Sequence, residues 1–269
     1  MMASGKSKKK RLSRVLQLAG LVLLAVAAFG VFAFAYFKPA PPPAPTIDMA
    51  KAEQVQKKFE ADQAAQAAAI LAANEPLKVA QPAGRPLNVL FAGDSITVGR
   101  DASSEATSFR GLLVDRLAKR GPVTPVRIGD SGKLTAEVLP QAASFAGPAD
   151  LAIVELGTND IYKSTPEKFA KDYPAMLDAV RKGSPNAPLI CVGVWQSSPL
   201  AATLDATIDT ECAARSGRFV SLRAIHQNPS NKSTPGAPQF AGGLTDGAHP
   251  NDEGHSLVAG AILERLNLD

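Results

Sequence analysis

Residues 88–96 have the sequence Asn-Val-Leu-Phe-Ala-Gly-Asp-Ser-Ile, an apolar run that stops abruptly at a glycine and two polar residues. An uninterrupted apolar run of this length is typical of a strand buried on both faces of a parallel sheet. Gly93 permits a sharp turn, and Ser95 then follows the carboxyl end of the strand, where open α/β sheets bind their ligands. Ser95 is therefore a candidate nucleophile if other segments supply a base and oxyanion donors.

Short apolar runs alternate with longer helical patterns from residue 87 to the C-terminus. We expect strands at residues 87–92, 125–128, 151–156, 189–194 and 219–222. We expect helices at residues 107–120, 135–143, 166–182, 200–216 and 252–267, the last of them capped by Asn251. This alternation predicts an α/β fold with a parallel sheet that carries helices on both faces.

The positive charge of the chain is concentrated at its N-terminus. The 269 residues carry a net charge of +4, but residues 1–38 contain seven Lys or Arg and no Asp or Glu. The remainder has 22 basic against 25 acidic residues, a net charge of −3. We therefore expect no nucleic-acid partner, although a basic arm that binds RNA is the alternative interpretation of the N-terminal cluster.

A long apolar segment follows the basic cluster. Residues 15–37 are 23 residues without a charge, and as a helix they would extend about 35 Å, enough to cross a bilayer. The basic residues before them predict a cytoplasmic tail at residues 1–14 and an extracytoplasmic location for the rest of the chain. The alternative is a secretory signal peptide cleaved near the Ala-Phe-Ala sequence at residues 33–35. Both interpretations predict export.

Residues 38–86 are expected to connect this membrane segment to the folded domain. Residues 39–45 are rich in Pro and Ala and predict an extended spacer. Residues 46–73 are rich in Ala, Gln, Lys and Glu and predict a helical stalk, with a coiled-coil dimer as an alternative. Residues 74–86 contain three prolines and are interpreted as a linker, so the folded domain is expected to cover residues 87–269.

The residues that could complete a nucleophilic site lie in three later segments. Asp246 and His249 are three residues apart in a turn-forming segment, where a carboxylate can fold back onto the Nδ1 atom of the imidazole. Gly132 and Asn159 each closely follow a predicted strand and could supply a backbone and a side-chain donor to an oxyanion. The carboxyl ends of parallel strands share one edge of the sheet, so we expect these residues to converge near Ser95.

Four segments resemble the motif blocks of the SGNH, or GDSL, hydrolase family. They are Gly-Asp-Ser-Ile at residues 93–96, Ile-Gly-Asp-Ser-Gly at 128–132, Gly-Thr-Asn-Asp at 157–160 and Asp-Gly-Ala-His-Pro-Asn at 246–251. The resemblance extends from about residue 87 to the C-terminus. Two positions depart from the family pattern: Ile96 replaces the commoner Leu, and Arg127 replaces the Asn that often precedes the second block.

The resemblance implies a three-layer α/β/α sandwich with a five-stranded parallel sheet of the flavodoxin-like type. It implies that Ser95 is the nucleophile, His249 the base and Asp246 the residue that orients the base. It also implies an oxyanion hole formed by the backbone N–H groups of Ser95 and Gly132 and the side-chain amide of Asn159. The function implied is that of a serine ester hydrolase that works through an acyl-enzyme, without a cofactor or metal, on a small acyl ester or an acylated glycan.

Two other functions remain open at this stage. The acyl-enzyme could pass its acyl group to a cell-envelope glycan, which would make the protein an O-acyltransferase. A non-catalytic glycan-binding module is the alternative from a different class, and the complete set of Ser, His and Asp argues against it. Nothing in the sequence predicts the natural substrate or the oligomeric state.

Several remaining residues have both a structural and a functional interpretation. We expect Asp94 to accept backbone N–H groups at the turn, and His226 and His255 to be surface or packing residues. Trp195 follows the fourth predicted strand, where it could line a pocket or pack in the core. Cys191 and Cys212 could form a disulfide in an oxidising compartment or remain two buried thiols.

Overall fold

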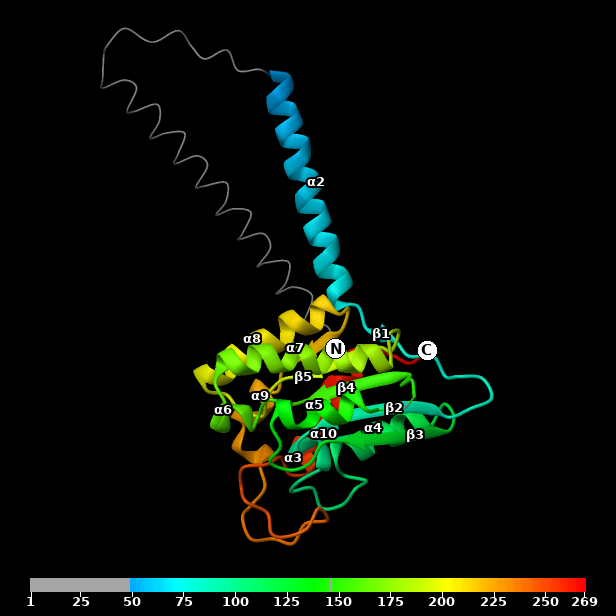
Figure 1. Ribbon diagram of the computed structural model, residues 1–269, viewed down its shortest axis with the longest axis vertical. Helices are drawn as coiled ribbons and strands as arrows, with labels where there is room; N and C mark the ends of the chain where they lie inside the picture. Colours follow the sequence, from blue (N-terminus) through cyan, green and yellow to red (C-terminus); the bar gives the residue numbers. More distant parts are fainter. Residues whose placement is uncertain (1–48, 146) are drawn as a thin grey trace, which may run out of the picture. The chain divides into compact units, whose positions relative to one another are not determined.

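A computed structural model describes residues 49–145 and 147–269, and its centre is a five-stranded parallel sheet (Figure 1). The strands lie in the order β3-β2-β4-β5-β6, and every neighbouring pair is parallel, which confirms the predicted α/β class. Their bounds are Leu87–Gly93 for β2, Val123–Ile128 for β3, Leu151–Glu155 for β4, Leu189–Val192 for β5 and Arg218–Val220 for β6.

The sheet is buried on both faces because alternate side chains of its central strands enter two separate hydrophobic clusters. Leu90 and Ala92 of β2 belong to the cluster covered by α5 (Thr135–Ala143), α7 (Pro166–Gly183) and α8 (Pro199–Ala214). Val89 and Phe91 belong to the cluster covered by α4 (Phe109–Ala118) and α10 (Asp252–Leu263). Figure 1 shows the sheet between these two helical layers, as the continuous apolar runs predicted.

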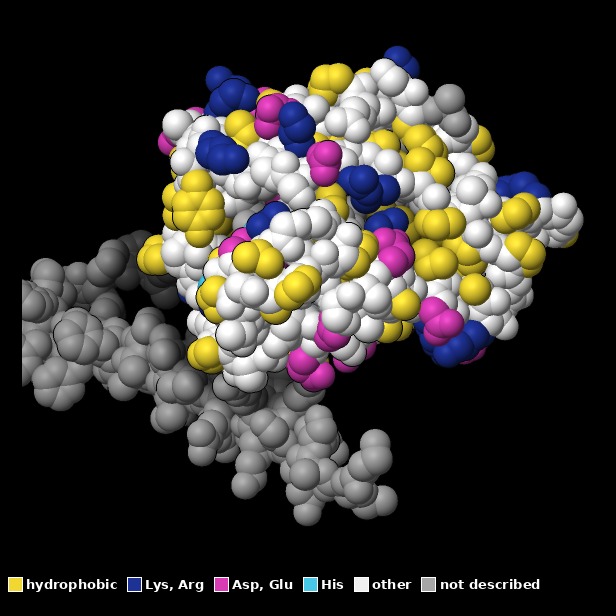
Figure 2. Space-filling view, turned by 90° about the horizontal axis from the view of Figure 1, so that it is seen from below, with side chains coloured by type: hydrophobic (Ala, Val, Ile, Leu, Met, Phe, Trp, Pro, Cys, Tyr) yellow, Lys and Arg dark blue, Asp and Glu magenta, His cyan; other side chains and the backbone are white. Residues whose placement is uncertain are grey.

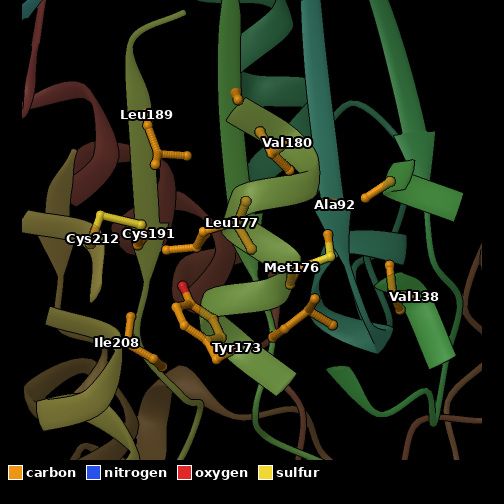
Figure 3. Close-up of a cluster of buried hydrophobic side chains, with 14 of the residues drawn as sticks. Ala92, Val138, Tyr173, Met176, Leu177, Val180, Leu189, Cys191, Ile208 and Cys212 are labelled. Carbon is orange, nitrogen blue, oxygen red and sulfur yellow. A yellow bond between two sulfur atoms is a disulfide. The ribbon is translucent and has the colours of Figure 1, made fainter. Parts of the chain in front are cut away.

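The first cluster contains the only two cysteines of the chain, and they form a disulfide (Figure 3). Cys191 of β5 and Cys212 of α8 are both fully buried, and their Cα atoms are 6.0 Å apart. Beside them, Tyr173, Met176 and Leu177 of α7 are fully buried against the sheet. The disulfide thus joins the sheet to α8. The sequence left open a disulfide or two buried thiols, and the structure contains the disulfide.

Polar side chains fix the starts of the longer helices. Ser108, Thr165 and Ser198 each accept a backbone N–H group from the first turn of the helix that follows, namely α4, α7 and α8. Asn251 caps α10 as predicted, since its Oδ1 atom accepts the N–H of Gly254 at 2.9 Å. The caps define where each helix leaves the loop that precedes it, and several of those loops carry the site described below.

Both ends of the folded domain differ from the prediction. The last helix was expected to reach residue 267, but α10 ends at Leu263, and Leu266–Asn267 form the strand β7. β7 pairs in parallel with β1 (Leu77–Lys78), and Val79 beside it is fully buried. Packed residues therefore begin about ten positions before the predicted domain start at Leu87, inside the segment interpreted as a linker.

The predicted stalk overlaps the helix α2 (Met49–Asn74). Its side chains that can be assessed, from Lys51 to Ala64, are exposed. No helix within residues 49–145 and 147–269 is long and apolar enough to cross a bilayer. The predicted cytoplasmic tail, the membrane segment at residues 15–37 and the Pro-rich spacer lie outside the described residues.

Candidate active site

Ser95 is the first residue of the short helix α3 (Ser95–Val98), directly after β2. Asp94 caps this helix by accepting the N–H of Ile96 at 3.1 Å, as expected from the sequence. Gly93 is required at the end of β2, because a Cβ atom there would lie 1.9 Å from the Oγ1 atom of Thr97 and 2.7 Å from the carbonyl oxygen of Glu155. The tight turn leaves the hydroxyl of Ser95 at the carboxyl edge of the sheet.

His249 lies between Ser95 and Asp246 and is within hydrogen-bonding distance of both. Its Nε2 atom is 2.8 Å from the Oγ atom of Ser95, and its Nδ1 atom is 2.7 Å from the Oδ2 atom of Asp246. With a proton on Nδ1, the imidazole donates to the carboxylate and can accept the serine proton at Nε2. Three residues from two distant segments therefore form a continuous Ser-His-Asp hydrogen-bond chain.

The carboxyl group of Asp246 is held in its charged form. Burial raises its pKa, but the backbone N–H groups of Ala248 and His249 donate to its Oδ1 atom at 2.8 and 3.2 Å. These bonds and the interaction with the imidazole outweigh burial, and the pKa of Asp246 lies well below its usual range. The side chain is thus an ionised acceptor for the Nδ1–H group of His249 at neutral pH.

A second carboxylate, which the sequence did not single out, holds the segment that carries Asp246. The Oδ2 atom of Asp101 accepts the backbone N–H of Asp246 at 3.0 Å and the hydroxyl of Ser233. The Oγ atom of Ser233 in turn accepts the N–H of Gly247 at 3.0 Å. Asp101 is buried and has a positive φ of 66°, a conformation that Asp tolerates better than most residues. The segment after α3 and the loop at residues 227–243 therefore both hold the acid of the Ser-His-Asp chain.

The two predicted oxyanion donors occupy different surroundings. The Nδ2 atom of Asn159, which follows β4, donates to the Oδ2 atom of Asp94 at 3.0 Å and to the carbonyl oxygen of Lys133 at 3.2 Å. Gly132 has a positive φ of 76°, and its carbonyl oxygen accepts from the Nζ atom of Lys163 at 3.1 Å. Asn159 lies in the same hollow as Ser95, whereas Gly132 is not among the described residues that line it.

A buried pair of carboxyl groups, which was not predicted from the sequence, lies behind the serine. Glu155 of β4 is fully buried, and its Oε2 atom accepts the N–H and the hydroxyl of Thr97 at 3.2 and 2.9 Å. Burial raises the pKa of both Glu155 and Asp94, and the charge of Asp94 raises that of Glu155 further. Glu155 is thus the member of the pair that keeps its proton, which leaves Asp94 as the acceptor for Asn159.

A hollow of about 360 Å³ opens beside Ser95 and His249. Figure 2 views the molecule from the end where residues 227–250 lie, and Lys and Arg side chains stand out at several places on this face. Trp195 both lines the hollow and packs in the core, since it is 4% exposed and donates its indole N–H to the carbonyl oxygen of Ala248 at 2.7 Å. The hollow is lined by Ser95, Thr158, Asn159, Tyr162, Trp195, Gln196, His226, Lys232, Gly247, Ala248 and His249.

The other two histidines do not belong to the Ser-His-Asp chain. His255 is fully buried, accepts the N–H of Phe109 at 3.3 Å and lies 3.0 Å from the carbonyl oxygen of Arg100, so it is a packing residue as expected. His226, by contrast, lines the hollow, where its ring lies edge-on to that of Trp195 with the centroids 5.3 Å apart. From the sequence we expected a surface or packing role for His226 and did not predict its position beside Ser95 and His249.

A serine, a histidine and a carboxylate that form one hydrogen-bond chain at the carboxyl edge of a parallel sheet are the groups found in serine hydrolases. The model of the GDSL-like lipase/acylhydrolase family matches residues 91–257, more than half of the sequence, and the chain belongs to this family. A comparison with curated protein sequences gives no match.

Solved structures share the fold at low sequence identity. TesA is 19% identical, with a TM-score of 0.52 over 65% of this chain and 96% of that one. Phospholipase A1 from Streptomyces albidoflavus NA297 is 16% identical, with a TM-score of 0.51 over 66% and 98%. A member of the lipolytic G-D-S-L family from Veillonella parvula DSM 2008 is 16% identical, with a TM-score of 0.51 over 66% and 96%. These similarities show a shared fold.

Proposed function

We propose that this protein is an extracytoplasmic esterase in which Ser95 attacks the ester carbonyl and His249 takes its proton. The observation that carries the proposal is the position of the imidazole, 2.8 Å from the hydroxyl of Ser95 and 2.7 Å from the carboxylate of Asp246. The alcohol leaves with a proton from His249, and an acyl-enzyme remains. His249 then activates a water molecule, which releases the acid and restores the serine.

The tetrahedral intermediate carries negative charge on the former carbonyl oxygen and needs donors that already point at it. We assign this role to the backbone N–H groups of Ser95 and Gly132 and to the amide of Asn159. Both donations of the Asn159 Nδ2 atom go to Asp94 and Lys133. Donation to an oxyanion therefore requires the amide to give up or share one of these partners, and the carbonyl of Lys133 is the longer contact.

The nucleophile is tested by labelling with a fluorophosphonate probe, which reacts with an activated serine. We expect Ser95→Ala to abolish both labelling and turnover of a short-chain aryl ester while the far-UV circular dichroism spectrum remains unchanged. Ser144→Ala, a change of the same size at an exposed position at the end of α5, serves as the matched control. Labelling that persists in a folded Ser95→Ala protein would disprove the assignment.

The location is part of the same proposal. We infer that residues 15–37 anchor the protein in a membrane and that the segment between them and β1 holds the folded domain on the far side from the basic tail. The disulfide between Cys191 and Cys212 supports this location, because disulfides persist in oxidising compartments and are rare in the cytosol. Protease treatment of intact cells or spheroplasts should digest the domain, and a domain protected until the membrane is lysed would contradict it.

Hydrolysis and acyl transfer are separated by their products. An esterase releases free acid at the same rate with or without a glycan acceptor, whereas an O-acyltransferase forms an acylated glycan at the expense of the free acid. Mass spectrometry of a reaction containing an aryl ester and an oligosaccharide distinguishes the two, and we expect free acid as the main product.

A further inference from the structure

Lys232 is a cation inside the hollow that contains Ser95 and His249. Its side chain is half-buried, and no Asp or Glu in the described part of the chain forms an ion pair with it. No carboxylate is present among the described residues that line the hollow. The ammonium group of Lys232 therefore has no anionic partner among the described residues that line the hollow.

The backbone holds Lys232 in a fixed position relative to the catalytic base. Lys232 forms an antiparallel bridge with Pro250, the residue that follows His249. Its carbonyl oxygen accepts from the side chain of Asn251 at 3.0 Å, and its N–H donates to the carbonyl oxygen of Pro229 at 3.1 Å. The lysine is thus part of the same framework as the base and not of a free loop.

Two other polar side chains of the hollow, His226 and Tyr162, are compatible with a bound anion. Burial lowers the pKa of His226 to about 4, and the nearby charge of Lys232 lowers it as well, so His226 is uncharged at neutral pH. The hydroxyl of Tyr162 accepts from the amide of Gln196 at 2.8 Å and keeps its own proton for donation. One uncompensated positive charge therefore lies among neutral donors beside the serine.

We propose that Lys232 binds an anionic group, a carboxylate or a phosphate, carried by the ester substrate, so that the hollow selects acyl esters of acidic molecules. This inference rests on the proposed esterase function of Ser95 and His249, and it names the substrate class of that site. The ammonium group and the anion form a charge-assisted contact that orients the ester toward the serine. Both anion types share this chemistry, and the substrates below distinguish them.

The test compares esters of the same shape that differ in charge. The pair is 4-acetoxybenzoate and 4-acetoxybenzamide, with 4-acetoxyphenyl phosphate as the phosphate arm, and each rate is divided by the rate of alkaline hydrolysis. We expect kcat/KM to favour an anionic ester over the neutral one by about fivefold or more, the size of a partly screened ion pair. Lys232→Gln should reduce this ratio to near one, and Lys232→Glu should invert it. Lys171→Gln, which removes an exposed charge from α7, should leave the ratio unchanged.

Binding separates this inference from the proposed function. In Ser95→Ala, calorimetry should detect 4-hydroxybenzoate binding more tightly than 4-hydroxybenzamide, and Lys232→Gln in that background should remove the difference. Ester turnover whose charge preference is the same with and without Lys232 would overturn the inference and leave the esterase intact. Charge-dependent binding without any turnover would instead remove the esterase proposal, and no preference for the anion in either assay would overturn the role of Lys232.

Discussion

Loss of the disulfide should measurably destabilise the folded domain. Cys191 and Cys212 are separated by 21 residues in the sequence, and both are fully buried. In the chain-entropy description, closing a loop of this length removes about 11 cal/mol/K from the unfolded ensemble, or about 3 kcal/mol at 25 °C. We therefore expect reduction to lower the free energy of unfolding by about 3 kcal/mol, a substantial fraction of the stability of an ordinary domain.

Urea titration followed by tryptophan fluorescence measures this change. Trp195 is the only tryptophan in the chain and is 4% exposed, so its emission reports the loss of the core beside the hollow. With an m-value of about 2 kcal/mol/M, reduction should shift the midpoint down by about 1.5 M. Each sample must equilibrate in denaturant with reductant, because both sulfur atoms are buried and become reducible only on unfolding.

The double variant Cys191→Ala/Cys212→Ala provides the control. It should unfold at the same urea concentration with and without reductant, and at a slightly lower concentration than the reduced wild type because the sulfur atoms leave a small cavity. If the wild-type midpoints with and without reductant agreed within about 0.2 M, the entropic reasoning would be refuted for this loop.

Substitutions at three further positions test the site. Asp246→Asn should lower kcat by about 10⁴-fold, because an amide holds His249 in the wrong tautomer. Steady-state kinetics with a neutral aryl ester measures kcat, and a loss below tenfold would contradict the role of Asp246. Asn159→Ala should lower kcat by about 10²–10³-fold with little change in KM, as removal of one oxyanion donor does; a change confined to KM would assign Asn159 to binding instead. Glu155→Ala should destabilise by about 2–4 kcal/mol because Thr97 loses its acceptor, whereas Glu155→Gln keeps that acceptor. The folded state holds the Glu155 proton to higher pH than the unfolded chain, so this group makes wild-type stability fall as pH rises above the ordinary value of 4.5. Relative to wild type, Glu155→Gln should therefore be more stable at pH 8 than at pH 4 in urea unfolding, and a difference independent of pH would contradict the raised pKa.

The parallel sheet could be predicted because a strand that is buried on both faces requires a continuous run of apolar residues. The runs that became β2, β4 and β5 are apolar at every position that enters either cluster, and the expected bounds differ from those observed by two residues or fewer. Ser95 and Asn159 follow β2 and β4, which are neighbours in the sheet although β3 lies between them in the sequence. The rule that parallel strands share a carboxyl edge was enough to bring these two residues together.

Contacts between distant segments could not be predicted from the sequence. Pairing of β1 with β7 depends on two segments almost 190 residues apart meeting, and no local periodicity encodes it. Glu155 lies at the end of a continuous apolar run, and only the structure shows that it is fully buried and forms a carboxyl pair with Asp94. Asp101 and Lys232 lie in irregular segments, where position is set by hydrogen bonds to other loops.

The hydrogen bonds of Ser233 have a consequence for how substrate range could change in this enzyme. Its hydroxyl connects the loop beside the hollow to Asp101 and to Gly247, so a length change in that loop would also displace the acid that orients the imidazole. Insertions or deletions there should thus slow the reaction for every ester alike. New selectivity is more accessible through single side-chain exchanges at exposed positions that line the hollow, such as Tyr162, which leave the framework of the loop intact. Directed-evolution libraries on this scaffold should therefore vary residue identity at constant loop length and keep Ser233 and Gly247 fixed.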